Sequence, residues 1–276
     1  MARCGIMRVE NCGTGYFLAL DTGHYRTSPE ILDSLKVETI NCLRKSLLSE
    51  PGTTHDLVAI APSHPFIRSF YEIGTQIRNG LNSDVLQQFV FKHFYTYVNA
   101  IFQSTRSAYD GEIMTVDSYI ENRLNDSGTY PTLALFVYAY HLDLPEWILE
   151  HEKMQMLMRH ISIMVSLEND VLSLNKELKS GHFTNNLIPL FMYHDGNTIQ
   201  EAVDRALNMV SKSYKAYKSI QTEFLDSVPA EYKPALEKLL LSFTECREGL
   251  LLWSYVSKRY VDAENPGDEV KVVIGE

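Results

Sequence analysis

Apolar residues recur at helical spacing along almost the whole chain after Ser28. Read with a period of 3.6 residues, the pattern predicts helices over residues 28–49, 64–80, 83–106, 115–126, 130–141, 145–181, 198–226 and 230–262. Glycine and proline residues separate these segments, and both disfavour continued helix. Elsewhere the sequence shows no useful length of the apolar–polar alternation that a strand requires. We therefore expect an all-α fold, a helical bundle with a central cavity between facing helices.

The composition limits the classes of function. Of the 276 residues, 45% are hydrophobic, which is enough to bury one sizeable core. A net charge of −10 argues against a nucleic-acid binder, because such proteins normally show a basic surface. The four cysteines form no CxxC pair, so we expect free thiols in a reducing compartment.

Location and domain limits follow from the same pattern. The apolar runs are shorter than the roughly 18 residues of a membrane span, and the N-terminus has no clear signal core. We expect a cytoplasmic protein without a transmembrane segment, with a homodimer as a candidate assembly. Its expected parts are an atypical N-terminal segment at 1–27, a single α-helical domain at 28–262 and a tail at 263–276.

One segment places three candidate oxygen ligands on the same face of a predicted helix. Asn169, Ser173 and Glu177 are spaced at i, i+4 and i+8, so on a helix they point the same way over about 12 Å. An amide oxygen, a hydroxyl and a carboxylate suit Mg²⁺, which takes one or two carboxylates and adds water and phosphate oxygens. A solvated helix face would carry the same residue types. Against that alternative, residues 154–174 are apolar on several sides, as expected of a buried helix.

This segment resembles the second metal motif of class I terpene synthases, (N/D)Dxx(S/T)xxxE with a basic residue before the Glu, and it matches at every defined position. The resemblance implies the class I terpenoid synthase fold, with Asn169, Ser173 and Glu177 as metal ligands. It implies Mg²⁺, up to three ions, with Mn²⁺ as the alternative metal. Lys176 would then meet the diphosphate of the substrate.

A second segment resembles the diphosphate-sensing part of the same family. It begins at Arg123, 46 residues before the metal motif, and the resemblance makes Arg123 the diphosphate sensor. Asp126 would be the linker and Ser127 the effector position. Gly128 and the following Pro131 predict a helix break there, as this role requires.

A third segment, Arg259-Tyr260, resembles the family's terminal Arg-Tyr pair. An arginine fork is suited to phosphate oxygens, and the tyrosine adds one hydroxyl. An Arg-Tyr pair by itself is common, so its weight comes from lying in order with the other two segments. The resemblance spans roughly residues 60–262.

Aromatic residues are the expected lining of the cavity. The chain has 12 Phe, 16 Tyr and 2 Trp, and aromatic faces stabilise a carbocation without offering a nucleophile. Phe91, Tyr95, Phe136 and Trp253 are the candidates. The alternative for each of them is ordinary core packing.

The N-terminal region departs from the family pattern. Class I terpene synthases carry a first, aspartate-rich metal motif on an earlier helix, whereas the residues upstream here contain no paired aspartates. Asp21, which follows an apolar run, is the one candidate for a remnant of that motif.

The expected function is that of a Mg²⁺-dependent enzyme acting on a prenyl diphosphate, with farnesyl diphosphate as the expected substrate. The enzyme would ionise it, cyclise or quench the carbocation, and release diphosphate. Three alternatives stay open. They are a catalytically impaired relative that binds diphosphate without turnover, a chain-elongating prenyltransferase, which would need two aspartate-rich motifs, and a helical interaction protein whose motif matches are chance.

Overall fold

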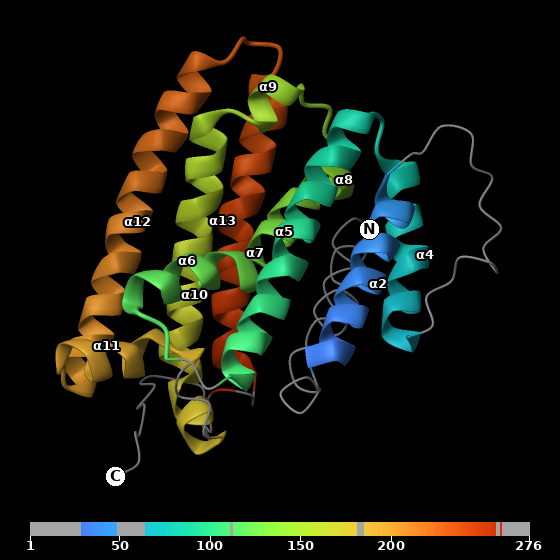
Figure 1. Ribbon diagram of the computed structural model, residues 1–276. Coiled ribbons are helices and arrows are strands. Elements are labelled where there is room, and N and C mark those ends of the chain that lie inside the picture. Colours follow the sequence, from blue (N-terminus) through green and yellow to red (C-terminus); the bar gives the residue numbers. More distant parts are fainter. Residues whose placement is uncertain (1–28, 49–63, 111–112, 181–184, 258–259, 261–276) are drawn as a thin grey trace. The chain divides into compact units, whose positions relative to one another are not determined.

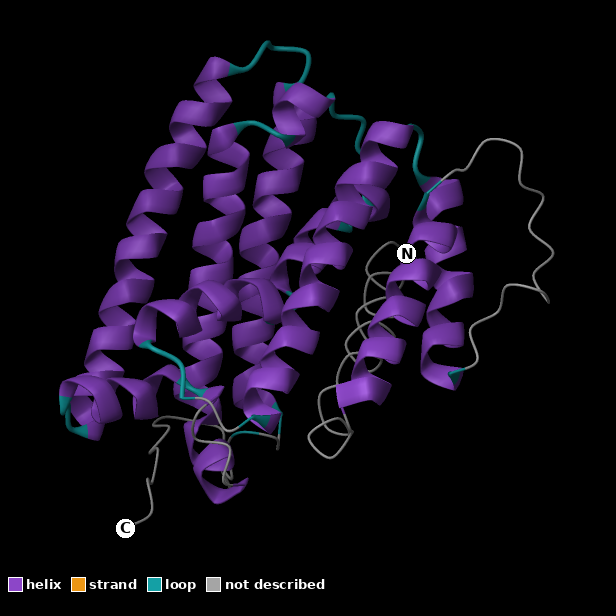
Figure 2. Ribbon diagram, viewed as in Figure 1, coloured by secondary structure: helices purple, strands orange, loops and turns teal. Residues whose placement is uncertain are grey.

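Helices form the regular structure of the described chain. The computed structural model describes residues 29–48, 64–110, 113–180, 185–257 and 260. Those ranges contain helices joined by loops and no strand (Figure 2), so the all-α prediction is confirmed. None of their helices is both long and apolar enough to cross a membrane.

The chain divides into two compact units. Unit 1 comprises Met1–Glu112, Asn125–His151 and Pro234–Leu239. Unit 2 comprises Ile113–Leu124, Glu152–Lys233 and Leu240–Glu276. A single domain over 28–262 stays a prediction.

In unit 1, α2 (Pro29–Leu47) packs against α4 (Pro65–Gly80) and α5 (Asp84–Tyr109). The two helices α2 and α4 lie side by side (Figure 1), and they meet closely at Gly74. A Cβ added at Gly74 would lie 2.3 Å from Ser46 Oγ, so this contact needs glycine. The short helices of the unit are α7 (Thr129–Ala134), α8 (Phe136–Ala139) and α9 (Glu146–Leu149).

Unit 2 is built around one long helix. Its helices are α6 (Val116–Asp126, up to Leu124), α10 (Glu152–Ser180), α11 (Leu187–Asp195), α12 (Ile199–Ser227) and the part of α13 (Lys233–Val256) from Leu240. α10 runs beside α12, and α11 packs against both (Figure 1). Apolar side chains along α10 and α12 are completely buried, including Leu157, Ile161 and Phe224. This core fixes α10, the helix that carries the predicted metal motif.

Several predicted helix ends are confirmed. Gly128 and Gly196 take left-handed backbone angles, with φ of 75° and 69°, and they lie just before α7 and just after α11. Glycine adopts such angles without steric cost. α12 begins with a capping box, in which the side chains of Thr198 and Glu201 each accept a hydrogen bond from the other residue's backbone N–H.

Other boundaries differ from the prediction. The helix predicted over 145–181 is two helices, because i→i+3 hydrogen bonding such as that of His151 N–H to Ile148 O closes α9 before α10 begins. The one predicted over 130–141 is α7 and α8, and the chain turns at His141, where φ is 51°. The last predicted helix stops at Val256, because Ser257 is extended.

Helix α11 was not predicted. Its sequence is almost continuously apolar and contains Pro189, so it shows no helical period. The helix forms because Pro189 falls within its first turn, where proline is tolerated, and because Asn186 caps it.

Candidate functional site

The three metal-ligand candidates lie on α10 in unit 2, as predicted. Asn169 and Glu177 are half-buried, and Ser173 is 1% exposed. The Ser173 hydroxyl has no hydrogen-bond partner among the described residues. A buried hydroxyl without a partner is costly, so this oxygen is suited to a ligand that the chain itself does not supply.

The structure brings the predicted sensor to the metal motif. Arg123 Nη2 donates a hydrogen bond of 2.9 Å to Asn169 Oδ1, across 46 residues of sequence. The amide nitrogen of Asn169 donates to the hydroxyl of Tyr260 at 3.3 Å. One residue from each of the three segments that resemble the family therefore meets at Asn169.

A buried carboxylate also binds Arg123. Asp170 is completely buried, and its Oδ1 lies 3.3 Å from Arg123 Nε. Its Oδ2 accepts hydrogen bonds from the hydroxyl of Tyr119 at 2.8 Å and from the backbone N–H of Leu187 at 3.0 Å. The carboxylate thus links α6, α10 and the start of α11.

The pKa of Asp170 is raised to about 6, first because burial disfavours the charged form and then because Glu177 repels it. The Arg123 guanidinium opposes this shift, as do the donors on Leu187 and Tyr119. A carboxyl group with this environment depends on its partners to stay ionised at neutral pH.

Glu177 is held by the residue that caps α11. Asn186 is completely buried, and its Nδ2 donates to Glu177 Oε2 at 2.8 Å and to the backbone oxygen of Asp170 at 2.6 Å. Its Oδ1 accepts from the backbone N–H of Ile188 at 2.9 Å.

Lys176, a predicted diphosphate ligand, and Trp253, a predicted cavity aromatic, both lie near the ring of Tyr260. Lys176 Nζ lies 5.7 Å from the centre of the Tyr260 ring. The Trp253 ring meets the same ring edge to face, with centres 5.9 Å apart, and Trp253 is 47% exposed. Arg259 and Asp21 lie outside the described residues.

The predicted linker and effector residues lie in unit 1. Asp126 is the last residue of α6, and its Oδ2 accepts from Ser104 Oγ at 2.7 Å. Ser127 Oγ donates to Thr129 Oγ1 at 2.9 Å, just before the left-handed Gly128. The helix break predicted for the effector position is present.

The other aromatic candidates also lie in unit 1. Phe91 and Tyr95 are neighbours on α5, with ring centres 5.8 Å apart, and Tyr95 is 41% exposed. Phe136 is buried, and its ring stacks on that of Tyr140 with centres 6.0 Å apart. Their role as a cavity lining stays a prediction.

The donor set of α10 fits a hard divalent cation. In the described ranges no three His, Cys, Asp or Glu side chains gather as they would in a site built from those residues alone. One carboxylate, one amide oxygen and one hydroxyl on successive turns agree instead with an ion that takes its other ligands from water and phosphate. The unpartnered Ser173 oxygen is the observation that favours this fit.

Sequence reasoning missed Tyr119, Asp170 and Asn186. Asp170 stands inside the motif but points about 100° away from Asn169, so it had no assigned role. Tyr119 could have been found, because it lies one turn before Arg123 on the same helix. The role of Asn186 depends on a helix that shows no period in sequence, so no local signal indicated it.

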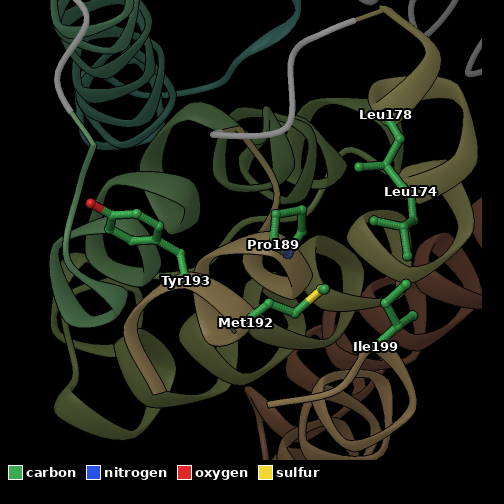
Figure 3. A pocket seen from close by; sticks show the side chains of 6 residues that line it. All are labelled: Leu174, Leu178, Pro189, Met192, Tyr193 and Ile199. Carbon is green, nitrogen blue, oxygen red and sulfur yellow. The ribbon is translucent and has the colours of Figure 1, made fainter. Parts of the chain in front are cut away.

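A separate pocket lies between α10, α11 and α12, within unit 2. It has a volume of about 340 Å³ and is lined by Leu174, Leu178, Pro189, Met192, Tyr193 and Ile199. Figure 3 shows that α10 supplies the two leucines, and no charged side chain is among the lining residues. The lining suits apolar groups and offers nothing that would neutralise a diphosphate.

Comparison with known families matches residues 42–216 to the family described as terpene synthase family 2, C-terminal metal binding. That range contains the whole of α6, α10 and α11, and hence Arg123, the metal-ligand candidates and Asn186.

Curated relatives of the chain include fungal proteins. A sesquiterpene cyclase of Aspergillus oryzae, hepA, is 27% identical over 72% of this chain and 54% of its own length. An alpha-muurolene synthase of Coprinopsis cinerea is 29% identical over 64% of this chain and 41% of its own length. The chain spans about half the length of these curated relatives.

Solved structures share the fold. A linalool/nerolidol synthase from Streptomyces clavuligerus, crystallised with 2-fluorogeranyl diphosphate, aligns with a TM-score of 0.73 at 18% identity, over 90% of this chain and 80% of that chain. The ancestral reconstruction SVS_A2 aligns with a TM-score of 0.70 at 18% identity, over 91% of this chain and 71% of that chain. The family match covers more than half of the sequence and confirms the resemblance found in the motifs: the chain belongs to terpene synthase family 2.

Proposed function

We propose that the protein is a Mg²⁺-dependent terpene synthase that ionises a prenyl diphosphate, with farnesyl diphosphate as the substrate. The observation that supports this most directly is the 2.9 Å contact of Arg123 with Asn169, on the helix where Ser173 Oγ is buried with no partner among the residues that the structure describes. Relatives named as sesquiterpene cyclases and synthases support the choice of a fifteen-carbon substrate.

Asn169, Ser173 and Glu177 are the residues that would hold Mg²⁺. When bound, the ion supplies positive charge that stabilises the departing diphosphate. The side chains themselves set the position of that charge, because they lie on one face of a helix that is packed into a core.

Arg123, Lys176 and Tyr260 would bind the diphosphate, together with Arg259. Arg123 is suited to this task because Asp170 holds its Nε, which fixes the plane of the guanidinium fork. The allylic carbon–oxygen bond breaks with both electrons staying on the diphosphate oxygen, and preorganised cations favour this step. Asp126 and Ser127 are proposed to link Arg123 to the substrate, and Phe91, Tyr95, Phe136 and Trp253 to face the carbocation.

The first test is turnover by purified protein with Mg²⁺ and, separately, geranyl, farnesyl or geranylgeranyl diphosphate, analysed by gas chromatography–mass spectrometry. A Mg²⁺-dependent hydrocarbon or terpene alcohol from farnesyl diphosphate is the expected result. Binding of diphosphate without any product would overturn the catalytic proposal in favour of an impaired relative.

A paired substitution tests the metal ligands. Asn169→Ala combined with Glu177→Ala should lower turnover by about 100-fold or more, because two of three ligands are lost. Asn175→Ala is the matched control, since it removes an amide from another face of the same helix. Unchanged turnover and Mg²⁺ dependence in the pair would show that the metal assignment is wrong.

A further inference from the structure

Asn186 makes three hydrogen bonds with a completely buried side chain. Its Oδ1 caps α11 by accepting from Ile188 N, and its Nδ2 donates to the Asp170 backbone oxygen and to Glu177 Oε2. An amide group has two N–H donors, and here each has its own acceptor. Hydrogen bonds therefore hold both the oxygen and the nitrogen of the amide group.

The two acceptors on α10 lie two helical turns apart in sequence but face the same nitrogen. Backbone carbonyls of a helix point toward its C-terminus, whereas side chains lean toward its N-terminus. The carbonyl of Asp170 and the carboxylate of Glu177 therefore approach one another along the helix, and Asn186 Nδ2 bridges them at 2.6 and 2.8 Å. The bridge restrains a flexible glutamate side chain against a rigid backbone atom.

We propose that Asn186 is a positioning residue for the metal site: by donating to Glu177 Oε2 it sets the orientation in which that carboxylate meets the cation. The inference rests on the proposed function, because it assumes that Glu177 is a metal ligand. Few other side chains could replace asparagine here. Aspartate has no donor, serine does not reach both acceptors, and glutamine is longer by one methylene.

The same residue thereby ties the metal site to the start of α11. Leu187, the first residue of that helix, donates its backbone N–H to Asp170, the carboxylate that holds Arg123. A correctly capped α11 thus places donors on both acidic residues of the motif. Substitutions can separate the effect of losing the helix cap on stability from the effect of losing the donor to Glu177 on metal binding.

Asn186→Ser is the main variant, because serine caps helices about as well as asparagine but lacks the donors for Glu177 and Asp170. Binding of Mn²⁺ in the presence of inorganic diphosphate is measured by electron paramagnetic resonance, alongside the melting temperature of the full chain. We expect Mn²⁺ affinity to fall by about 10-fold or more, as is usual when a group that orients a metal ligand is removed. The melting temperature should change less than in Asn186→Ala, which loses the cap as well.

Two controls make the result specific. Thr198→Ala removes the cap of α12 without touching α10, and its Mn²⁺ affinity should equal that of the unsubstituted protein. Combining Asn186→Ser with Glu177→Ala should weaken Mn²⁺ binding no further than Glu177→Ala alone, because the donor then has no ligand to orient. If the serine variant does not fold, Asn186→Thr takes its place with the same hydroxyl and one more methyl group.

The outcomes distinguish this inference from the proposed function. Full Mn²⁺ affinity in Asn186→Ser, with weakened binding in Glu177→Ala, would overturn the positioning role and leave the metal site intact. Unchanged binding in Glu177→Ala would overturn the metal site itself. Weak binding in Asn186→Ala but not in Asn186→Ser would reduce Asn186 to a helix cap.

Discussion

Both units carry exposed ion pairs, whereas the buried pairs among the described residues lie in unit 2. In unit 1, Lys92 pairs with Glu150 while their side chains are 49% and 41% exposed. In unit 2, Arg123 pairs with Asp170, whose side chain is 1% exposed, and Arg247 pairs with Glu168 at 17% and 11%.

Burying a charged pair is costly, and an apolar pair of similar volume is often as stable. The buried pair of Arg123 and Asp170 lies beside Asn169 of the metal motif, where the positive charge of Arg123 is proposed to bind the diphosphate. In unit 1, the buried titratable side chain of His93 has a pKa lowered to about 4, chiefly through burial, and is neutral at pH 7. In this comparison the buried charged pair of Arg123 and Asp170 lies beside the metal motif, whereas the buried histidine of unit 1 is neutral.

The largest effect is expected from removing the buried carboxylate. Asp170→Ala leaves Arg123 and Tyr119 without their acceptor, and we expect the free energy of unfolding to fall by about 3–5 kcal/mol. Urea denaturation followed by circular dichroism measures it. Glu150→Ala in unit 1 is the control, with an expected loss of about 1 kcal/mol or less. Equal losses in the two variants would remove the distinction between the buried and the exposed ion pair.

The next effect concerns pH and unit 1. The buried Nε2 of His93 has no hydrogen-bond partner in the described part of the chain, and the His93 ring contacts those of Phe89 and Tyr130. Its pKa is lowered from 6.5 to about 4 by burial and by Lys92. Below pH 6.5 the unfolded chain therefore binds a proton at His93, whereas the folded protein binds that proton only near pH 4. Stability should fall as pH drops from 6.5 toward 4, by about 3 kcal/mol from this group.

His93→Phe isolates that contribution, because phenylalanine keeps the ring but cannot titrate. Asp170 acts in the opposite direction, since its raised pKa favours the folded protein below about pH 6. The quantity to measure is thus the difference in unfolding free energy between the original protein and His93→Phe, at pH 7 and at pH 4.5. A difference that does not change with pH would mean that His93 is solvated.

A third effect tests packing without charge. Gly74→Ala places a Cβ 2.3 Å from Ser46 Oγ and 2.7 Å from Ser46 Cβ, so α2 and α4 must separate. We expect a loss of about 1–3 kcal/mol. Gly249→Ala is the matched control in α13, where an added Cβ meets nothing within 4 Å, and helix propensity should make it more stable by about 0.5–1 kcal/mol. Thermal melting of both variants gives the comparison, and a destabilised Gly249→Ala would contradict it.

Much of the fold could be predicted because its signals are local. The glycines at 128 and 196 and the threonine cap at 198 mark helix ends by backbone preference and side-chain reach. Helix α11 could not be found this way, because its apolar residues are continuous and its helical state depends on Asn186 and on packing against α10 and α12. The break before α10 was missed because the sequence around Glu150 contains neither glycine nor proline.

The candidate site could likewise be predicted only where its signals are local in sequence. The common helix face of Asn169, Ser173 and Glu177 follows from helical spacing alone. The meeting of Arg123 with Asn169 was expected only through resemblance to a family, since nothing in the two segments fixes their distance. The roles of Asp170 and Asn186 were not predicted, because they depend on partners from other helices, which a single sequence does not show.

The smallest expected effect is the coupling within the exposed pair of unit 1, and salt distinguishes it from its buried counterpart. A double-mutant cycle on Lys92 and Glu150 should give about 0.2–1 kcal/mol at low salt and nearly nothing in 1 M NaCl, where charges are screened beyond about 3 Å. The cycle on Arg247 and Glu168 should keep most of its coupling, because two hydrogen bonds join the side chains out of reach of ions. A salt dependence shared by both pairs would mean that the pair of Arg247 and Glu168 is open to solvent, and burial would then no longer distinguish it from the pair of Lys92 and Glu150.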